Sequence, residues 1–297
     1  MRNDDMVIRV RGLGKKFLVP QKHEQDFSRA PSWRERLKEF FPSFLGADDS
    51  DFFWALREVS FEVRRGSIFA VMGGSGCGKS TVLKSMIGLL RPAVGHILVA
   101  GEDYWEASEA RRTAIGRRFG VLFQGGALWS SLTVGENVAL PLQMLTELDT
   151  TAISELVRLK LALVGMGAAE AKLPAALSGG MRKRAGLARA LALDPDILFF
   201  DEPSAGLDPI TSRRLDELIL ELRDGLGATI IIVSHELPSL LGICDDGVFL
   251  DADAKTAIAH GAPRDLRDSS THPTVQAFMQ RSTPGSVFPG ANSNVVC

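Results

Sequence analysis

A glycine-rich stretch that begins at Gly73 constrains the fold of this chain more than any other segment. It follows an apolar run, 67–72, and precedes a run with helical periodicity, 82–90, which predicts strand, glycine loop and helix in that order. In that setting the glycines let successive backbone N–H groups turn toward one anion, and the helix adds the positive end of its dipole. The stretch is therefore predicted to be a P-loop that cradles the phosphates of a nucleotide. Its residues are Gly73, Gly74, Ser75, Gly76, Cys77, Gly78, Lys79, Ser80 and Thr81.

Two side chains of this loop predict ATP and Mg²⁺ as its ligands. Lys79 is placed to reach the β- and γ-phosphates, and the Ser80 hydroxyl to take one position on Mg²⁺, an ion that needs few protein ligands. A glycine-rich turn without a ligand is the alternative interpretation. The complete G-x-x-x-x-G-K-[ST] spacing between a strand and a helix argues against it.

The composition is that of an ordinary globular protein with ample material for a hydrophobic core. The chain has 297 residues, of which 45% are hydrophobic and 24% charged, and a formal net charge of -2. We therefore expect one large domain, or one domain with appendages, and no nucleic-acid partner. Cys77, Cys244 and Cys297 form no C-x-x-C pair, which favours a reducing, cytosolic setting without a metal site of this kind. No apolar run approaches the ~20 residues of a membrane span, so work at a membrane would require a partner.

The first residues predict a small β-layer. Residues 6–11 alternate apolar and charged side chains, as a half-exposed strand does, and the glycines from Gly12 to Gly14 predict a turn after it. Phe17 follows that turn, in a place where a nucleotide-binding domain can stack an aromatic ring on adenine. A core aromatic that closes the β-layer is an equally supported interpretation of Phe17.

A second motif predicts the catalytic carboxylates. Residues 197–200 are apolar, and Asp201 and Glu202 follow directly. Runs like this one and 229–233 are too hydrophobic for a one-sided sheet and predict the buried parallel strands of an α/β core. Carboxylates at the carboxyl edge of such a sheet are costly unless they meet a cation or a proton. With the P-loop upstream, this fits a Walker B strand in which Asp201 holds Mg²⁺ and Glu202 is the general base for the attacking water.

A third motif opens a strongly basic helix that leads into the Walker B strand. At this point the chain resembles the ATP-binding-cassette ATPases, whose signature LSGGQ precedes such a helix, and the resemblance covers residues 6 to about 261. It implies an α/β P-loop NTPase core with an N-terminal antiparallel β-layer and an α-helical signature subdomain. The signature departs from the family pattern at Met181, where glutamine is expected, but keeps the anion-binding Ser-Gly-Gly. The motif is Leu177-Ser178-Gly179-Gly180-Met181.

The same resemblance implies roles for residues outside the P-loop. Gln124 is similar to the Q-loop glutamine, which acts in catalysis and on Mg²⁺, and His235 to the switch histidine that senses the γ-phosphate. Taken alone, a histidine at the end of a strand is more often structural. Asp208 closes a segment, 204–208, that is similar to the D-loop at the nucleotide. The signature residues imply a second anion site at a helix N-terminus, which in this family closes over the ATP of a second copy in a head-to-tail homodimer.

Two segments narrow the resemblance. Residues 124–138 and 177–184 are similar to the ATPase subunits of Mla/Mce-type lipid transporters. Membership would imply transport of phospholipid or another hydrophobic substrate, an integral membrane permease, an envelope lipid-binding protein with an Mce domain and small accessory cytoplasmic subunits. The chain would then sit at the cytoplasmic face of the inner membrane.

Other function classes remain as alternatives. An insertion ahead of a Phe-Trp-Ala-Leu strand is similar to exporters of polysaccharides. A soluble cassette protein of ribosomes or DNA repair usually has two cassettes or a long coiled coil, and this chain has one P-loop and no sustained heptads. A binding module with an inactive nucleotide site is disfavoured because the residues for catalysis are all present. These residues are Lys79, Asp201, Glu202 and His235.

The chain divides into segments as follows. Residues 20–51 are punctuated by prolines and predict an inserted loop with one short amphipathic helix, 32–41, which packs on its own domain or meets a membrane surface or a partner. The predicted segments are 1–19, the start of the ATPase domain; 20–51, the insertion; 52–262, the ATPase core with a helical subdomain at about 128–193; 263–282, a helical extension; and 283–297, a disordered tail.

Overall fold

A six-stranded sheet lies at the centre of the molecule, in a computed structural model that describes residues 5–18 and 52–280. Its strand order is β10-β9-β3-β8-β7-β6, and all neighbours are parallel except β9 and β10. The predicted insertion at 20–51 and the tail at 283–297 lie outside the described residues. The strands of this sheet are β3 (Ile68–Gly73), β6 (Phe119–Leu122), β7 (Ile197–Asp201), β8 (Thr229–Val233), β9 (Asp246–Leu250) and β10 (Ala257–His260).

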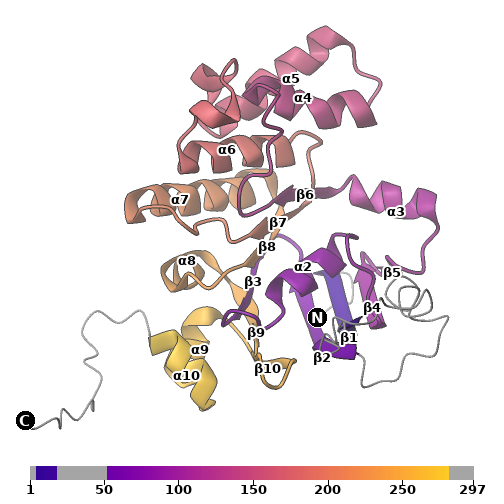
Figure 1. Cartoon of the computed structure of the whole chain (residues 1–297), viewed down its shortest axis with the longest axis vertical. Helices are drawn as coiled ribbons and strands as arrows, with labels where there is room; N and C mark the ends of the chain where they lie inside the picture. Colours follow the sequence, from indigo (N-terminus) through magenta and orange to yellow (C-terminus); the bar gives the residue numbers. More distant parts are fainter. Residues whose placement is uncertain (1–4, 19–51, 281–297) are drawn as a thin grey trace, which may run out of the picture.

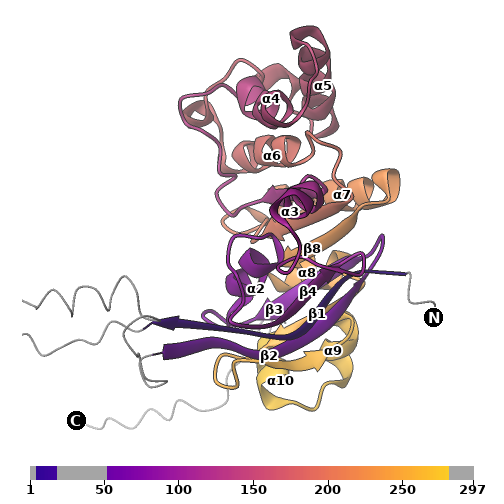
Figure 2. The same cartoon turned by 90° about the vertical axis from the view of Figure 1, so that its right-hand side faces the viewer.

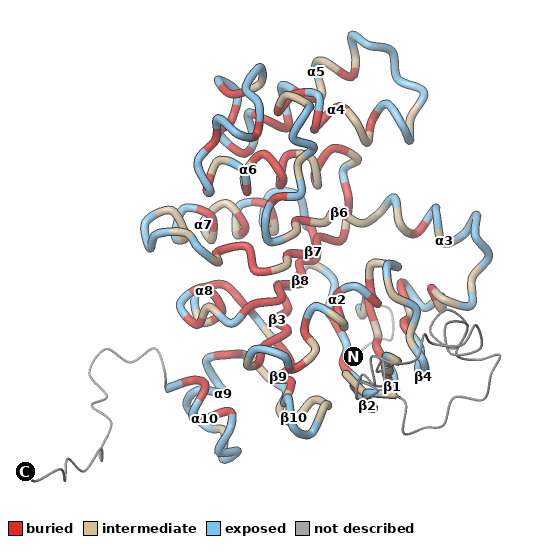
Figure 3. The backbone as a smooth tube through the Cα atoms, in the orientation of Figure 1, coloured by how far each residue is buried: buried red, intermediate tan, exposed pale blue. Residues whose placement is uncertain are grey.

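The central strands are buried on both faces. Every residue of β3 and β8 is buried, and the strands appear as a continuous red column in Figure 3. Successive residues of β7 enter two different core clusters, because side chains alternate between the faces of a sheet. Ile197 and Phe199 pack with the antiparallel layer and α2, whereas Leu198 and Phe200 pack with the helices of the other face. Two-sided burial accounts for the continuous apolar runs of the sequence.

A second, antiparallel sheet covers one face of the core. Its order is β2-β1-β4-β5, and β1 and β2 pair along their length from Met6 opposite Arg64 to Leu18 opposite Phe52. Figure 2 shows these two strands as a long ribbon beside β3. The strands are β1 (Met6–Leu18), β2 (Phe52–Arg64), β4 (Val94–Val99) and β5 (Glu102–Asp103).

The predicted turn at Gly12 to Gly14 is wrong, because β1 continues through these glycines to Leu18. Gly12 has a φ of +57° and donates its N–H to the Ser60 hydroxyl, and the register with β2 shifts between Val10 and Leu13. A glycine with positive φ in a strand makes a bulge as readily as a turn. The pairing with β2, which follows the insertion in the sequence, determines that this glycine forms a bulge and not a turn.

The helices surround the six-stranded sheet, and one group lies at an end of the molecule (Figure 1). Helices α4, α5 and α6 lie together at one end of the molecule, away from the antiparallel sheet, and α2 follows β3 after residues 74–78. No described helix combines the length and the apolar character that crossing a bilayer requires. The helices are α2 (Lys79–Met86), α3 (Glu109–Gly116), α4 (Val134–Leu145), α5 (Thr150–Leu163), α6 (Gly179–Ala190), α7 (Pro209–Leu226), α8 (Leu237–Ile243), α9 (Pro263–Ser269) and α10 (Pro273–Gln280).

Local capping explains where several helices begin. Thr133 and Glu136 form a reciprocal capping box at α4, and Asp149 caps α5 by accepting from the Ala152 N–H. Two short 3₁₀ turns, Gly167–Ala169 and Pro174–Ala176, lead from α5 to α6. The predicted α/β core with an antiparallel β-layer and a helical subdomain is thus confirmed.

We expect Phe199→Ala to lower the free energy of unfolding by about 3–5 kcal/mol, because Phe199 is fully buried and packs edge-on against Phe119 at 5.2 Å. Urea unfolding followed by circular dichroism would measure the loss. Phe53→Ala is the matched control, since Phe53 is 49% exposed, and it should cost under about 1 kcal/mol. Equal losses for the two variants would contradict the two-sided core.

Candidate nucleotide-binding site

The glycine loop lies between the end of β3 and the start of α2, as the sequence predicts, and its geometry requires glycine at both ends. Gly73 has a φ of +143°, and a Cβ there would lie 2.3 Å from the Leu250 carbonyl oxygen. Gly78 has a φ of +96°, and a Cβ there would lie 2.4 Å from the Leu56 side chain. Both positions therefore exclude a side chain by conformation and by space. Ser75 and Gly76, in the middle of the loop, are exposed.

Lys79 lies buried beneath this loop. Its ammonium group donates to the carbonyl oxygens of Gly73 and Gly74, both at 2.8 Å. The Cys77 sulfur lies 3.9 Å from the same nitrogen, and burial raises the pKa of the Cys77 thiol. The lysine is therefore held by neutral groups of its own loop, and its positive charge remains for an anionic ligand.

Asp201 and Ser80 come together at the carboxyl end of β7. Burial raises the pKa of Asp201, and the negative charge of Glu202 raises it further. Lys84, Lys79 and a hydrogen bond from Ser80 oppose these effects. A half-buried carboxylate beside a hydroxyl offers the oxygen ligands that Mg²⁺ prefers. In the described part of the chain no group of three or more His, Cys, Asp or Glu side chains could hold a metal. Mg²⁺ needs few protein ligands, since it keeps several waters and commonly binds phosphate oxygens.

Glu202 is held in place by the neighbouring strand β8. It has a φ of +51°, and its N–H donates to the Val233 carbonyl oxygen at 2.8 Å. One carboxylate oxygen lies 2.8 Å from Nδ1 of His235, and the other accepts from the Ser234 hydroxyl at 3.2 Å and the His235 N–H at 3.4 Å. Because a carboxylate only accepts, the Nδ1 position of His235 carries the proton in this pair. The predicted base and the predicted switch histidine are thus direct partners.

The signature residues form a second group, on α6 rather than at the P-loop. Ser178 is the N-cap of α6 and accepts from the Met181 N–H at 3.3 Å. Asp208 caps α7, with one carboxylate oxygen accepting from the N–H groups of Ile210 and Thr211 and the other from the Thr211 hydroxyl. These hydrogen bonds lower the pKa of Asp208. In both views of the fold α6 lies apart from α2 (Figures 1 and 2).

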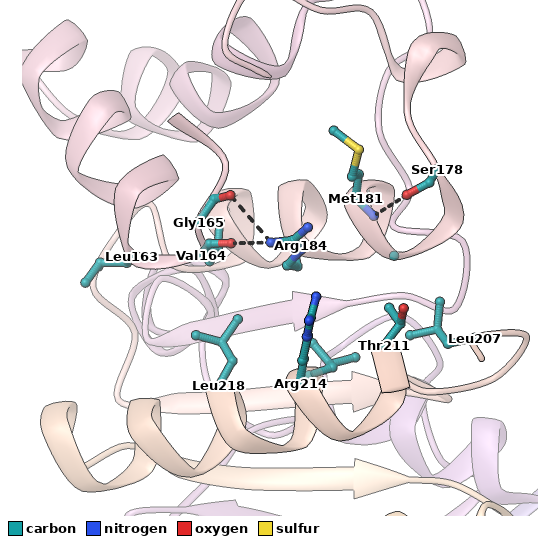
Figure 4. A pocket seen from close by; sticks show the side chains of 12 residues that line it. Leu163, Val164, Gly165, Ser178, Met181, Arg184, Leu207, Thr211, Arg214 and Leu218 are labelled. Atoms are coloured by element: carbon teal, nitrogen blue, oxygen red, sulfur yellow. Dashed lines mark hydrogen bonds between the residues drawn. The ribbon is translucent and has the colours of Figure 1, made fainter. Parts of the chain in front are cut away.

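A cavity of about 280 Å³ lies beside the signature, between α6, the end of α5 and α7. Figure 4 shows Arg184 on α6 and Arg214 on α7 facing each other across it, with Ser178 at one end. Arg184 also donates to the carbonyl oxygens of Val164 and Gly165 at 3.4 Å. The surroundings of the signature therefore carry positive charge.

Two predicted residues are not brought to Asp201 or Ser80. Gln124 is exposed and lines a cavity of about 190 Å³ with Lys183 on α6. Phe17 lies in β1, 40% exposed, with the Lys15 ammonium 5.5 Å from its ring centroid. Lys15 pairs with Leu56 of β2, the residue that contacts the loop at Gly78, so Phe17 lies on the strand next to the one that borders that end of the P-loop.

Two residues that the sequence did not single out support the carboxyl edge. Ser234 donates to Glu202, and Lys183 donates to backbone carbonyl oxygens just after the Walker B strand. Ser234 precedes the predicted switch histidine, and that position was the only available signal. Lys183 is one of several cations in a basic helix. The helical pattern of the sequence does not show which of these cations is buried and which is solvated.

The fold and the loop together define a P-loop nucleotide-binding domain. A family model described as ABC transporter matches residues 56–205. Over 77% of its length the chain is 42% identical to the intermembrane phospholipid transport system ATP-binding protein MlaF of Escherichia coli K12, of which it covers 84%. It is also 42% identical, over 77% of its length, to the probable ribonucleotide transport ATP-binding protein mkl of Mycobacterium tuberculosis H37Rv, of which it covers 63%.

A solved structure agrees with these relatives. The chain matches cbiO1 of Clostridium perfringens, described as part of the ABC transporter complex cbiONQ, with a TM-score of 0.71, 25% identity and coverage of 89% of this chain and 92% of that one. The chain belongs to the ABC transporter family, as the ATP-binding subunit that hydrolyses ATP. The resemblance inferred from the signature motif is confirmed.

The loop geometry makes a prediction for the nucleotide-free protein. Gly73→Ala should lower the free energy of unfolding by about 2–3 kcal/mol, because the new Cβ meets the Leu250 carbonyl oxygen and the φ is strained. Gly74→Ala is the control, since a Cβ there meets nothing within 4 Å, and we expect a loss below about 1 kcal/mol. Thermal unfolding without nucleotide would compare them. Similar melting temperatures for the two variants would refute the crowding at Gly73.

Proposed function

We propose that this chain supplies the energy for moving phospholipid or another hydrophobic substrate across a bacterial cell envelope. The observation that carries this proposal is the 42% identity to a protein named for intermembrane phospholipid transport, over 84% of that protein. The mycobacterial relative, at the same identity, is named for ribonucleotide transport. A ribonucleotide is therefore the second candidate substrate. The chain covers only 63% of the length of that relative, so its name is weaker support for a substrate.

We propose that the P-loop holds the phosphates of ATP. Lys79 would leave the carbonyl oxygens of Gly73 and Gly74 for the β- and γ-phosphates, and the loop N–H groups would bind the same oxygens. Asp201 and Ser80 fit Mg²⁺, which when bound neutralises charge on the phosphate oxygens. Gln124 is proposed to join them after a movement of its loop, because in this structure it lies exposed at a separate cavity.

Glu202 is proposed as the general base. A water oxygen would attack the γ-phosphorus, the bond to the ADP oxygen would break, and the water proton would pass to the Glu202 carboxylate. The hydrogen bonds from Ser234 and His235 fix the direction of that carboxylate before ATP arrives. The ring of His235 is 50% exposed, which leaves it accessible to a γ-phosphate that enters from the P-loop side.

The separation of the two anion sites supports a homodimer. Ser178, Gly179 and Gly180 begin α6, a helix of 12 residues, and two arginines flank them at the neighbouring cavity. Because α6 lies apart from the P-loop of the same chain (Figure 1), we propose that it closes over the ATP of a second copy. Asp208 would then lie at the junction of the two copies, and Phe17 would stack on adenine at the other end of the P-loop.

The proposed transporter needs further subunits. We propose an integral membrane permease, an envelope protein with an Mce domain and small accessory subunits, with this chain at the cytoplasmic face of the inner membrane. The Trp129 side chain is 61% exposed on the loop before α4, a loop that the fully buried Asn137 holds by hydrogen bonds to Trp129, Leu132 and Thr133. A fixed loop with an exposed indole suits contact with the permease.

The base is tested by Glu202→Gln in the purified full-length chain. We expect kcat to fall at least ~100-fold with little change in ATP affinity, because the general base is lost while the phosphate contacts remain. Glu221→Gln, which changes an exposed acid on α7 in the same way, should stay within about fivefold of the wild-type rate. A Glu202→Gln protein that hydrolyses ATP at the wild-type rate would remove Glu202 from the mechanism.

The substrate and partners are tested by affinity purification of the tagged chain from detergent-solubilised native membranes, with proteins and lipids read by mass spectrometry. We expect a permease, an Mce-domain protein and phospholipid. Trp129→Ala should reduce permease recovery, whereas Leu89→Ala, which removes another exposed apolar side chain, should not. A ribonucleotide or polysaccharide transport partner would replace the lipid proposal, and the absence of any membrane partner would contradict coupling to transport.

A further inference from the structure

Lys183, on the signature helix α6, makes contacts that its place in a basic helix does not suggest. Its side chain is 5% exposed, and its ammonium group donates to three backbone carbonyl oxygens. These belong to Glu202 at 3.2 Å, Pro203 at 2.6 Å and Ala205 at 2.6 Å. An ammonium has three N–H donors, so one turn of the chain, residues 202–205, satisfies all of them.

The turn at residues 202–205 depends on this cation. Glu202 has a φ of +51°, a conformation that costs a non-glycine residue free energy, and Ala205 donates back to the Glu202 carbonyl oxygen at 3.3 Å. This backbone points three carbonyl dipoles at one buried point, where they repel one another without a donor. Burial lowers the pKa of Lys183, and the negative charges of Glu202 and Glu236 oppose that shift.

The segment that Lys183 holds carries two predicted catalytic elements. It starts at Glu202, the proposed base, and ends at Asp208, the N-cap of α7. Within it the Leu207 N–H donates to the Ser204 carbonyl oxygen. A shift of the turn would move the Glu202 carboxylate away from His235 and Ser234, since its backbone and side chain are anchored at separate points. Displacements of about 1 Å at a reacting group can cost 10²-fold in rate.

The same helix also holds the loop that carries Gln124. Arg189 donates to the carbonyl oxygens of Gly126, at 3.3 Å, and of Ala127. Gly186 packs so closely on this loop that a Cβ there would lie 2.8 Å from the Gly126 carbonyl oxygen. One helix thus anchors the segments on both sides of the cavity that Gln124 and Lys183 line.

We propose that Lys183 is a positioning residue, which fixes the turn at residues 202–205 to the signature helix and so holds Glu202 and the D-loop where ATP hydrolysis requires them. This inference rests on the proposed function of Glu202. It assigns to α6 a second task besides the anion site at its start. Movement of the signature helix would then move the base and the D-loop of the same chain with it.

The test compares Lys183→Met with Lys160→Met in the full-length chain. Both lysines are buried and helical, but the partner of Lys160 among the described residues is Asp194, which lies outside the proposed site. We expect Lys183→Met to lower kcat about 30-fold or more with the affinity for a fluorescent ATP analogue within about twofold, because the P-loop is not touched. Lys160→Met should lose stability but keep kcat. Lys183→Arg should recover part of the rate, because it restores charge and donors.

The outcomes separate the two proposals. If the wild-type chain hydrolyses ATP, Glu202→Gln does not, and Lys183→Met retains the wild-type kcat, the positioning role is overturned while the function stands. If Lys183→Met and Lys160→Met lose kcat in proportion to their melting temperatures, Lys183 is structural only, which also overturns it. If the wild type shows no activity above Glu202→Gln, the proposed function fails and this inference fails with it. Should Lys183→Met not fold, Lys183→Gln decides, with a wild-type kcat counting against the proposal.

Discussion

The placement of two adjacent carboxylates, a half-buried Asp201 and a buried Glu202, at the carboxyl edge of a parallel sheet is the constraint on which the site depends. Asp201 has its pKa raised by burial and by the charge of Glu202, so the pair is stable only with compensating groups nearby. The protein supplies different groups to each acid. Lysines and a serine of α2 face Asp201, whereas Ser234 and His235, which follow β8, hold Glu202. The two acids therefore have different surroundings, which is the basis for the separate roles proposed for them.

Parallel strand register is what assembles these groups. Asp201 lies opposite Val233, so the residues that follow each strand, Glu202 and His235, meet directly beyond the edge. Strand β3 pairs with the other side of β8 and delivers the glycine loop to the same edge. Helix α6 then approaches from outside the sheet and holds two loops by cations, the buried Lys183 and the half-buried Arg189. The site is therefore stabilised as much by backbone carbonyl contacts as by side-chain pairs.

The sequence predicted the parts of the site that have local signals. The P-loop is recognised by the spacing of glycines, a lysine and a serine within one short loop. The Walker B acids are recognised by an apolar run that ends in two carboxylates. Both motifs could therefore be located from the sequence. The turn at Gly12 was mispredicted because a bulge and a turn use the same glycine conformation. Lys183 was missed because helical periodicity does not reveal which cation of a basic helix is buried.

By itself the sequence determined the α/β class, the phosphate loop, the two acids and the family, because each follows from residues that are close in the chain. Only the tertiary structure decided which of these residues touch. It paired Glu202 with His235 across 33 positions, placed Gln124 beside Lys183 of the signature helix at one cavity, and directed Lys183 to the turn after β7. The physical reason is that register and helix packing are set by the burial of whole faces, which no single motif encodes.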